Sequence, residues 1–200
     1  MEYSVQGANH AQRVAGVDEA GRGPLAGPVV AAAVILRDAG VATRVQDSKK
    51  LSAQKREILF EEITQEAEAI GIGIVDAPDI DRMNILQATM LAMKMAIEKL
   101  GINPTHVLVD GNRRPDCQFP TEAIIGGDSK VAEISAASII AKVTRDRIMI
   151  ELHREFPQYG FDVHKGYPTK HHREALVMHG PSRVHRQSFA PVRKVMNSAS

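Results

Sequence analysis

The chain has 200 residues with 25 basic and 24 acidic side chains, and no apolar run is long enough to span a membrane. Its single cysteine, Cys117, excludes an internal disulfide framework. The first residues have neither the basic flank nor the apolar core of a signal peptide, so we expect a cytoplasmic protein that does not enter membranes.

The charge is unevenly distributed along the chain. Residues 141–200 hold 11 Lys and Arg against 5 Asp and Glu, whereas residues 1–140 hold 14 against 19. This distribution suits a protein that binds a polyanion: the basic end would attract the polyanion, and carboxylates in the acidic part would hold metal ions beside it. A solvated basic face would give the same pattern, so charge alone does not establish nucleic-acid binding.

The first predicted elements flank a glycine-rich segment. An apolar run at 14–17 leads into Asp18 and Glu19, and a second apolar run follows at 29–36. This pattern predicts a strand, a tight turn and a second strand, with two carboxylates at the end of the first strand. A hairpin whose acids are merely solvated is the alternative interpretation.

The turn itself has the residues of a ligand-binding loop. Gly21 and Gly23 can adopt positive φ and allow a ligand to approach the bare backbone. Arg22, between them, offers a planar fork of donors that suits a phosphate.

The middle of the chain predicts alternating helices and strands. The expected elements are a helix N-capped by Ser52 with an apolar face reaching Ile70, a strand at 71–75, a helix that starts at Pro78 with an apolar stripe reaching Leu100, a strand at 106–111, a weaker strand at 122–125, and a long helix at 133–155. The remainder predicts one helix at 170–178, N-capped by Thr169 and closed by Gly180.

The strand at 106–111 ends in Asp110 and Gly111, which repeats the pattern of the first strand. Two strands that are separated by helices and end in Asp indicate a parallel pair in an α/β sheet, and ligand sites in such sheets lie at the carboxyl ends of the strands. Asp128 follows the last predicted strand. We therefore expect these acids to meet at one edge of the sheet.

The four candidate acids, Asp18, Glu19, Asp110 and Asp128, would repel one another unless a proton or a divalent cation neutralises them. Oxygen ligands without cysteine favour Mg²⁺ or Mn²⁺ over zinc. Two such ions bridging a phosphate would hold the attacking and leaving oxygens of a phosphodiester hydrolysis.

Other chemistries have little support in the sequence. The glycines at 21–27 follow the spacing G-x-G-x-x-x-G, which misses the dinucleotide-binding fingerprint, and no P-loop or G-x-S-x-G elbow is present. His171 and His172 are adjacent, and adjacent residues do not share a helix face, so a zinc site is disfavoured.

Ordered motifs from about residue 13 to residue 194 resemble those of the ribonuclease HII family, the type 2 ribonucleases H. The matching segments are 18–28 (DEAGRGPLAGP), 47–51 (DSKKL), 109–111 (VDG), 127–129 (GDS), 135–146 (SAASIIAKVTRD), 159–161 (YGF), 164–169 (HKGYPT) and 185–189 (HRQSF). The resemblance implies an α/β fold with a ribonuclease H-like mixed sheet flanked by helices and a helical C-terminal extension. It also implies a catalytic domain at 1–156 and the extension at 157–200.

The resemblance further implies an endonuclease that hydrolyses the RNA strand of RNA–DNA hybrids, and single ribonucleotides embedded in duplex DNA, leaving 5′-phosphate and 3′-hydroxyl ends. Such an enzyme would use Mn²⁺ or Mg²⁺, bind these duplexes as a monomer, and have no membrane partner.

The resemblance also assigns roles to individual residues. By motif match, Asp18, Glu19, Asp110 and Asp128 are the metal-binding catalytic acids. Gly21, Arg22 and Gly23 read the ribonucleotide backbone, Tyr167 packs at the RNA–DNA junction, and Ser48, Lys49 and Lys165 contact substrate. Among the basic residues near the C-terminus, we expect the phosphate contacts to be found within the set Lys165, Lys170, Arg183 and Arg186.

Two alternatives remain at this stage. A non-enzymatic module that binds RNA–DNA hybrids would use the acids structurally, but all four acids are present. A ribonuclease H-fold nuclease or recombinase acting on plain DNA would have no need of the Gly21–Gly23 loop or of Tyr167.

Overall fold

A single mixed sheet forms the centre of the molecule. The computed structural model describes residues 13–37 and 52–198. Its strands are β1 (Val14–Ala20), β2 (Val29–Leu36), β3 (Ala67–Val75), β4 (His106–Asp110) and β5 (Thr121–Ile124), arranged in the order β3-β2-β1-β4-β5. Strand β1 is antiparallel to β2 and parallel to β4, which confirms the predicted parallel pair.

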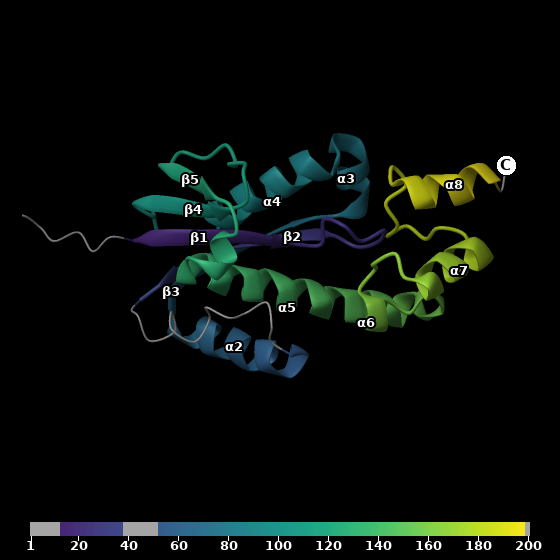
Figure 1. Cartoon of the computed structure of the whole chain (residues 1–200), viewed down its shortest axis with the longest axis horizontal. Coiled ribbons are helices and arrows are strands. Elements are labelled where there is room, and N and C mark those ends of the chain that lie inside the picture. Colours follow the sequence, from purple (N-terminus) through teal and green to yellow (C-terminus); the bar gives the residue numbers. More distant parts are fainter. Residues whose placement is uncertain (1–12, 38–51, 199–200) are drawn as a thin grey trace, which may run out of the picture.

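Helices cover both faces of this sheet (Figure 1). Helices α3 (Ala77–Met83) and α4 (Ile85–Glu98) lie on one face, and the long helix α5 (Ala132–Glu155) lies on the other with α2 (Ala53–Glu66) beyond it. Alternate residues of β2 divide between the two cores: Ala31 and Ala33 pack toward α4, whereas Ala32 and Val34 pack toward α5. This division follows from the two-residue period of a strand that is buried on both faces.

Strand β3 contains glycine because α4 lies directly against it. A β-carbon on Gly73 would lie 1.9 Å from the carbonyl oxygen of Ala92, and one on Gly71 would lie 2.0 Å from that of Ala96. The helix can approach the strand this closely only where the strand has no side chain.

The prediction that the apolar helix face reaches Ile70 is wrong, because the helix is shorter. Helix α2 starts at its Ser52 N-cap as predicted, but it ends at Glu66. Ala67 and Ile70 belong instead to β3, where they pair with Leu36 and Val34 of β2. The short strand predicted at 71–75 is therefore longer, because pairing with β2 extends it toward its N-terminus.

The predicted helix from Pro78 to Leu100 is two helices. Asn84 separates α3 from α4 with φ of 70°, a conformation that interrupts a helix. Its side-chain oxygen accepts hydrogen bonds from the backbone N–H groups of Leu86 and Gln87, at 3.0 and 3.1 Å, and so caps α4.

The C-terminal part holds more helix than predicted. The expected helix is α7 (Lys170–His179), capped by Thr169, and two further helices, α6 (Phe161–His164) and α8 (Ala190–Ser198), accompany it. Helix α8 packs Val192 against Leu25 and Leu176, so its position depends on contacts that are distant in sequence. Helices α7 and α8 lie together at one end of the molecule (right in Figure 1).

None of the helices in the described ranges has both the length and the apolar composition that crossing a bilayer requires.

Candidate active site

Three of the predicted acids lie at the adjacent ends of two parallel strands. Val17 of β1 pairs with Val109 of β4, so the next residues along the two strands, Asp18 and Asp110, are neighbours. Asp18 is only 6% exposed, and its Oδ1 accepts a hydrogen bond of 2.7 Å from the backbone N–H of Glu19. The apolar runs thus place the carboxylates at the sheet edge as the sequence predicts.

A short turn that is fastened to the end of β4 carries the fourth acid. Asp128 lies in the 3₁₀ turn η2 (Gly127–Ser129) and is 4% exposed. The backbone N–H of Gly127 donates to Oδ1 of Asp110 over 2.7 Å, which fastens this turn to the end of β4. We refer to Asp18, Glu19, Asp110 and Asp128 as the four-acid cluster.

The electrostatics of the cluster disfavour bare negative charge. Burial raises the pKa of Asp18 to about 8, with further increases from the charges of Glu19 and Asp110, while a hydrogen bond from the Ser138 side chain opposes the shift. Burial also raises the pKa of Glu19, against the lowering effect of Arg22, whose Nη1 lies 3.3 Å from Glu19 Oε1. Crowded carboxylates with raised pKa values are stabilised by a cation.

The donor chemistry of the cluster fits a hard divalent cation, because every candidate ligand is a carboxylate oxygen. In the described part of the chain, however, no three His, Cys, Asp or Glu side chains are already arranged to hold one ion. Asp110 lies close enough to Asp18 and Glu19 for its charge to raise the pKa of both.

A cavity of about 350 Å³ opens beside the cluster. It is lined by Glu19, by the predicted recognition residues Gly21, Arg22, Gly23 and Tyr167, and by Ala20, Arg56, Ser138, Ile139 and Lys142. The structure therefore brings the recognition residues together with one of the acids. Another cavity, of about 270 Å³, is also lined by Glu19 and Arg22. It extends to Asp110 and to the start of the 112–119 loop, which lies between β4 and β5.

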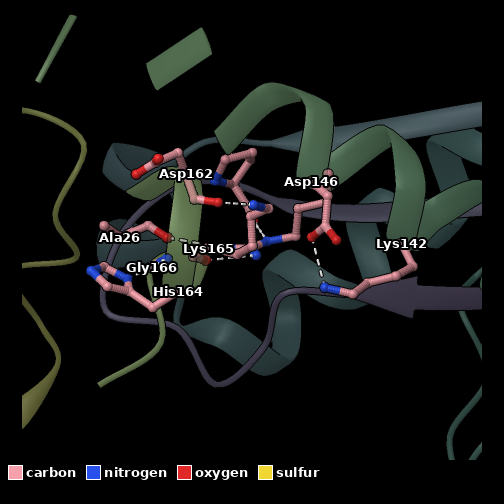
Figure 2. Close-up of polar contacts among 9 residues, drawn as sticks. Ala26, Lys142, Asp146, Asp162, His164, Lys165 and Gly166 are labelled. Atoms are coloured by element: carbon pink, nitrogen blue, oxygen red, sulfur yellow. Dashed lines mark hydrogen bonds and ion pairs between the residues drawn. The ribbon is translucent and has the colours of Figure 1, made fainter. Parts of the chain in front are cut away.

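Sequence reasoning assigned no role to Ser138 and Lys142. They lie four residues apart on α5, and so face the cavity from the same side of the helix. Lys142 Nζ also forms an ion pair of 2.6 Å with Asp146, one turn further along (Figure 2). The helical spacing of two polar residues in an otherwise small and apolar stretch was the signal that could have identified them.

Tyr167 is partly exposed and stands over the glycine loop, which we define as residues 21–28. A β-carbon on Gly23 would lie 3.8 Å from Cε1 of Tyr167. The Tyr167 backbone is held on both sides: its N–H donates to the carbonyl of His164 over 2.9 Å, and its carbonyl lies 2.9 Å from Nδ1 of His172. The ring therefore projects from an anchored backbone, with 43% of the residue exposed.

The remaining predicted contact residues have different environments. Lys165 is half-buried, and its Nζ donates to the carbonyl of Asp162. Lys170 and Arg183 are exposed and face acids, Glu174 at 3.8 Å and Glu155 at 2.5 Å respectively. Ser48 and Lys49 lie outside the described residues.

Arg186 is not a phosphate contact, and that prediction is wrong. The side chain is fully buried and donates four hydrogen bonds to backbone carbonyls of the glycine loop. The sequence shows its charge but not its burial.

Comparison with known proteins gives consistent results. A sequence model of the family described as Ribonuclease HII matches residues 15–192. A Ribonuclease HII from Burkholderia thailandensis is 58% identical over 184 residues, or 92% of this chain and 86% of that protein. The ribonuclease H2 of Pyrococcus horikoshii superposes with a TM-score of 0.79 at 29% identity, covering 93% of this chain and 98% of that one. The PCNA:RNase HII complex from Archaeoglobus fulgidus contains a chain with a TM-score of 0.76 at 30% identity, covering 88% and 95%.

Proposed function

This chain belongs to the ribonuclease HII family and is a ribonuclease H enzyme, and from that premise we propose that it cleaves at single ribonucleotides embedded in duplex DNA as well as within longer RNA–DNA hybrids. One observation carries the proposal: the first three residues of the glycine loop, Tyr167 and Glu19 of the four-acid cluster line one cavity. A site that joins ribose recognition to carboxylates can select a lone 2′-hydroxyl and cleave beside it.

We assign the four-acid cluster to a divalent cation site for Mg²⁺ or Mn²⁺. When bound, such ions lower the pKa of a ligated water and stabilise charge on the phosphate oxygens. Asp18 and Asp110 approach from neighbouring strand ends, Glu19 follows Asp18, and Asp128 is held by the turn that Gly127 fastens to Asp110. Hydrolysis at this site would leave 5′-phosphate and 3′-hydroxyl ends.

The glycine loop and Tyr167 would recognise the ribonucleotide. Gly21 has φ of 99°, is buried and lies against Arg145. The next two residues, Arg22 and Gly23, are exposed. Backbone groups at these exposed positions can meet the 2′-hydroxyl or its phosphate without a side chain between them. Tyr167 would pack its ring against the adjacent sugar, and we retain Ser48 and Lys49 as proposed contacts.

The duplex would extend from the cavity over the basic C-terminal extension. We keep Lys165, Lys170 and Arg183 as proposed phosphate contacts and treat residues 157–200 as an extension of a catalytic domain at 1–156, with the whole acting as a monomer. Replacing Lys170 and Arg183 together by Gln should lower the slope of log K against log salt by about one unit for each phosphate that the variant no longer neutralises. An unchanged slope would assign these charges to a solvated face.

Cleavage assays on four labelled duplexes test the proposal. The duplexes carry one ribonucleotide, four ribonucleotides, a full RNA strand, or DNA alone, each incubated with Mg²⁺, Mn²⁺ or EDTA. We expect cleavage of the first three with either metal, none with EDTA and none of plain DNA. Cleavage of the full hybrid without cleavage at one ribonucleotide would refute the selectivity, and cleavage in EDTA would refute the metal site.

A further inference from the structure

Two arginines are buried beneath the glycine loop. Arg145 of α5 is 1% exposed and Arg186 is fully buried. Burial lowers the pKa of Arg145 to about 10 and that of Arg186 to about 9, so both remain charged at neutral pH. Within the described ranges, neither guanidinium forms an ion pair, and backbone carbonyls accept their hydrogen bonds instead.

The two arginines both bind carbonyls at the end of the loop and differ in what else they hold. Arg145 donates to the carbonyls of Pro28, Ala26 and Lys165 at 2.9, 3.1 and 3.0 Å, so it joins the end of the loop to the segment before Tyr167. Ala26 and Lys165 are among the residues labelled in Figure 2. Arg186 instead reaches the beginning of the loop, which is the part that lines the cavity.

Arg186 makes a fork of hydrogen bonds to that part. Its Nη2 donates to the carbonyl of Gly21 over 2.6 Å, and its Nη1 donates to that of Arg22 over 3.0 Å. Nε and Nη2 also donate to the carbonyl of Gly27, at 3.0 and 2.9 Å. One buried group therefore fixes two consecutive peptide planes of the loop.

The orientation of these planes has a direct consequence. The carbonyl of Gly21 shares a trans peptide with the N–H of Arg22, and the carbonyl of Arg22 shares one with the N–H of Gly23. In a trans peptide the C=O and N–H point in opposite directions, so turning both carbonyls inward to Arg186 turns both N–H groups outward. Among the described residues, neither N–H has an acceptor, and both residues line the cavity.

We infer that Arg186 is a positioning residue that aims the N–H groups of Arg22 and Gly23 at an oxygen of the substrate, either a phosphate oxygen or the 2′-hydroxyl. Consecutive N–H groups that point to one side form a concave site for an anionic or electron-rich atom. The buried guanidinium also polarises both peptides, which strengthens them as donors. This inference rests on the proposed function, because it requires that the glycine loop contacts the substrate.

The test compares Arg186→Lys and Arg186→Met with a variant of similar stability loss. Lysine keeps the charge but loses the planar fork, so it cannot hold both carbonyls in this geometry. Ile63→Ala removes a fully buried side chain on α2 that does not line the cavity, and serves as the control for lowered stability. All measurements are made well below the lowest melting midpoint.

The decisive readout is the ¹H–¹⁵N spectrum during titration with an uncleaved duplex carrying one ribonucleotide, in EDTA. In the wild type and in Ile63→Ala, the Arg22 and Gly23 amides should shift downfield on binding. In Arg186→Lys both shifts should be lost, and kcat/KM for cleavage should fall by about 10–100-fold, as expected for two hydrogen bonds. If Arg186→Met fails to fold, the lysine variant still decides the question.

The outcomes separate the inference from the proposed function. If the wild type neither binds nor cleaves the duplex, the proposed function fails. If the wild type cleaves and its two amides shift, but Arg186→Lys retains both the shifts and wild-type kcat/KM, then Arg186 is only a structural residue and the inference is wrong. A loss of activity in Ile63→Ala equal to that in Arg186→Lys would also overturn it.

Discussion

The raised pKa of Asp18 predicts that this acid destabilises the metal-free protein. A carboxyl with a pKa of 3.8 when unfolded and about 8 when folded must take up a proton on folding at neutral pH. The ionisation of Asp18 therefore costs no stability below pH 3.8, and the free energy of unfolding falls as the pH rises from 3.8 toward 8. At about 1.4 kcal/mol per pH unit, the cost reaches roughly 4 kcal/mol at pH 7 as an upper limit.

Asp18→Asn should therefore stabilise the protein in EDTA. Asparagine keeps an oxygen that can accept the 2.7 Å hydrogen bond from the Glu19 N–H, but it carries no ionisation cost. Because its buried NH₂ group needs a new partner, we expect a net gain of about 1–3 kcal/mol in the free energy of unfolding. For a chain of this size that is a rise of roughly 3–10 °C in the melting midpoint.

The assay is thermal unfolding followed by circular dichroism at several pH values between 5 and 8, in EDTA and in Mg²⁺. The gain should shrink as the pH falls to 5, because the free-energy cost of protonating Asp18 on folding is smaller there. Mg²⁺ should stabilise the wild type more than the variant. Asp116→Asn, an exposed acid in the 112–119 loop, makes the same chemical change and should have little effect. A variant less stable than the wild type at pH 7.5, or a gain that does not vary with pH, would refute the reasoning.

Three further predictions concern recognition and folding. Tyr167→Ala should lower kcat/KM at a lone ribonucleotide by about 10–100-fold, the value of one stacking contact, and should lower kcat/KM on a four-ribonucleotide substrate much less. Equal losses of kcat/KM on both substrates would mean that Tyr167 only packs against the protein. Gly21→Val should abolish cleavage of both substrates, because a β-carbon there would lie 2.0 Å from Nε of Arg145. Gly101→Val is the control: Gly101 also has a positive φ, but no atom lies within 4 Å of its β-carbon position, so cleavage should stay intact. Burial lowers the pKa of His185 to about 3, so its contribution to stability is present above pH 6.5 and is lost as the pH falls, by up to about 2 kcal/mol at pH 5. Urea unfolding should therefore show that the free energy of unfolding falls less between pH 7.5 and pH 5 in His185→Gln than in the wild type. An identical fall in both proteins would count against this assignment.

The positions of Asp18 and Asp110 could be predicted because each follows a short apolar run. Such runs form buried strands, and the carboxyl ends of parallel strands meet at one edge, so Asp18 and Asp110 had to be neighbours once β1 and β4 paired. The break at Asn84 could not be predicted in the same way. An apolar stripe at helical spacing continues through it, and a left-handed asparagine depends on how α3 and α4 pack on the sheet.

For a similar reason, the sequence prediction placed Arg186 at the surface as a phosphate contact, whereas its side chain is buried. In a basic, histidine-rich segment a charged residue is expected at the surface. The carbonyls that Arg186 binds belong to residues more than 150 positions earlier in the chain, so only the folded structure brings donor and acceptors together. Lys165, in contrast, stays a proposed substrate contact, and its carbonyl accepts a hydrogen bond from Arg145 in the segment before Tyr167.

The four-acid cluster is tested most directly by single-turnover cleavage of a duplex with one ribonucleotide, comparing Asp110→Asn with the wild type in Mg²⁺. The substitution keeps the shape of the side chain and an acceptor for the Gly127 N–H, so circular dichroism should show an intact fold. We predict a loss of at least about 1,000-fold in the cleavage rate, roughly 4 kcal/mol of transition-state stabilisation. A correctly folded Asp110→Asn protein that cleaves within about tenfold of the wild-type rate would contradict the assignment of this cluster as the catalytic site.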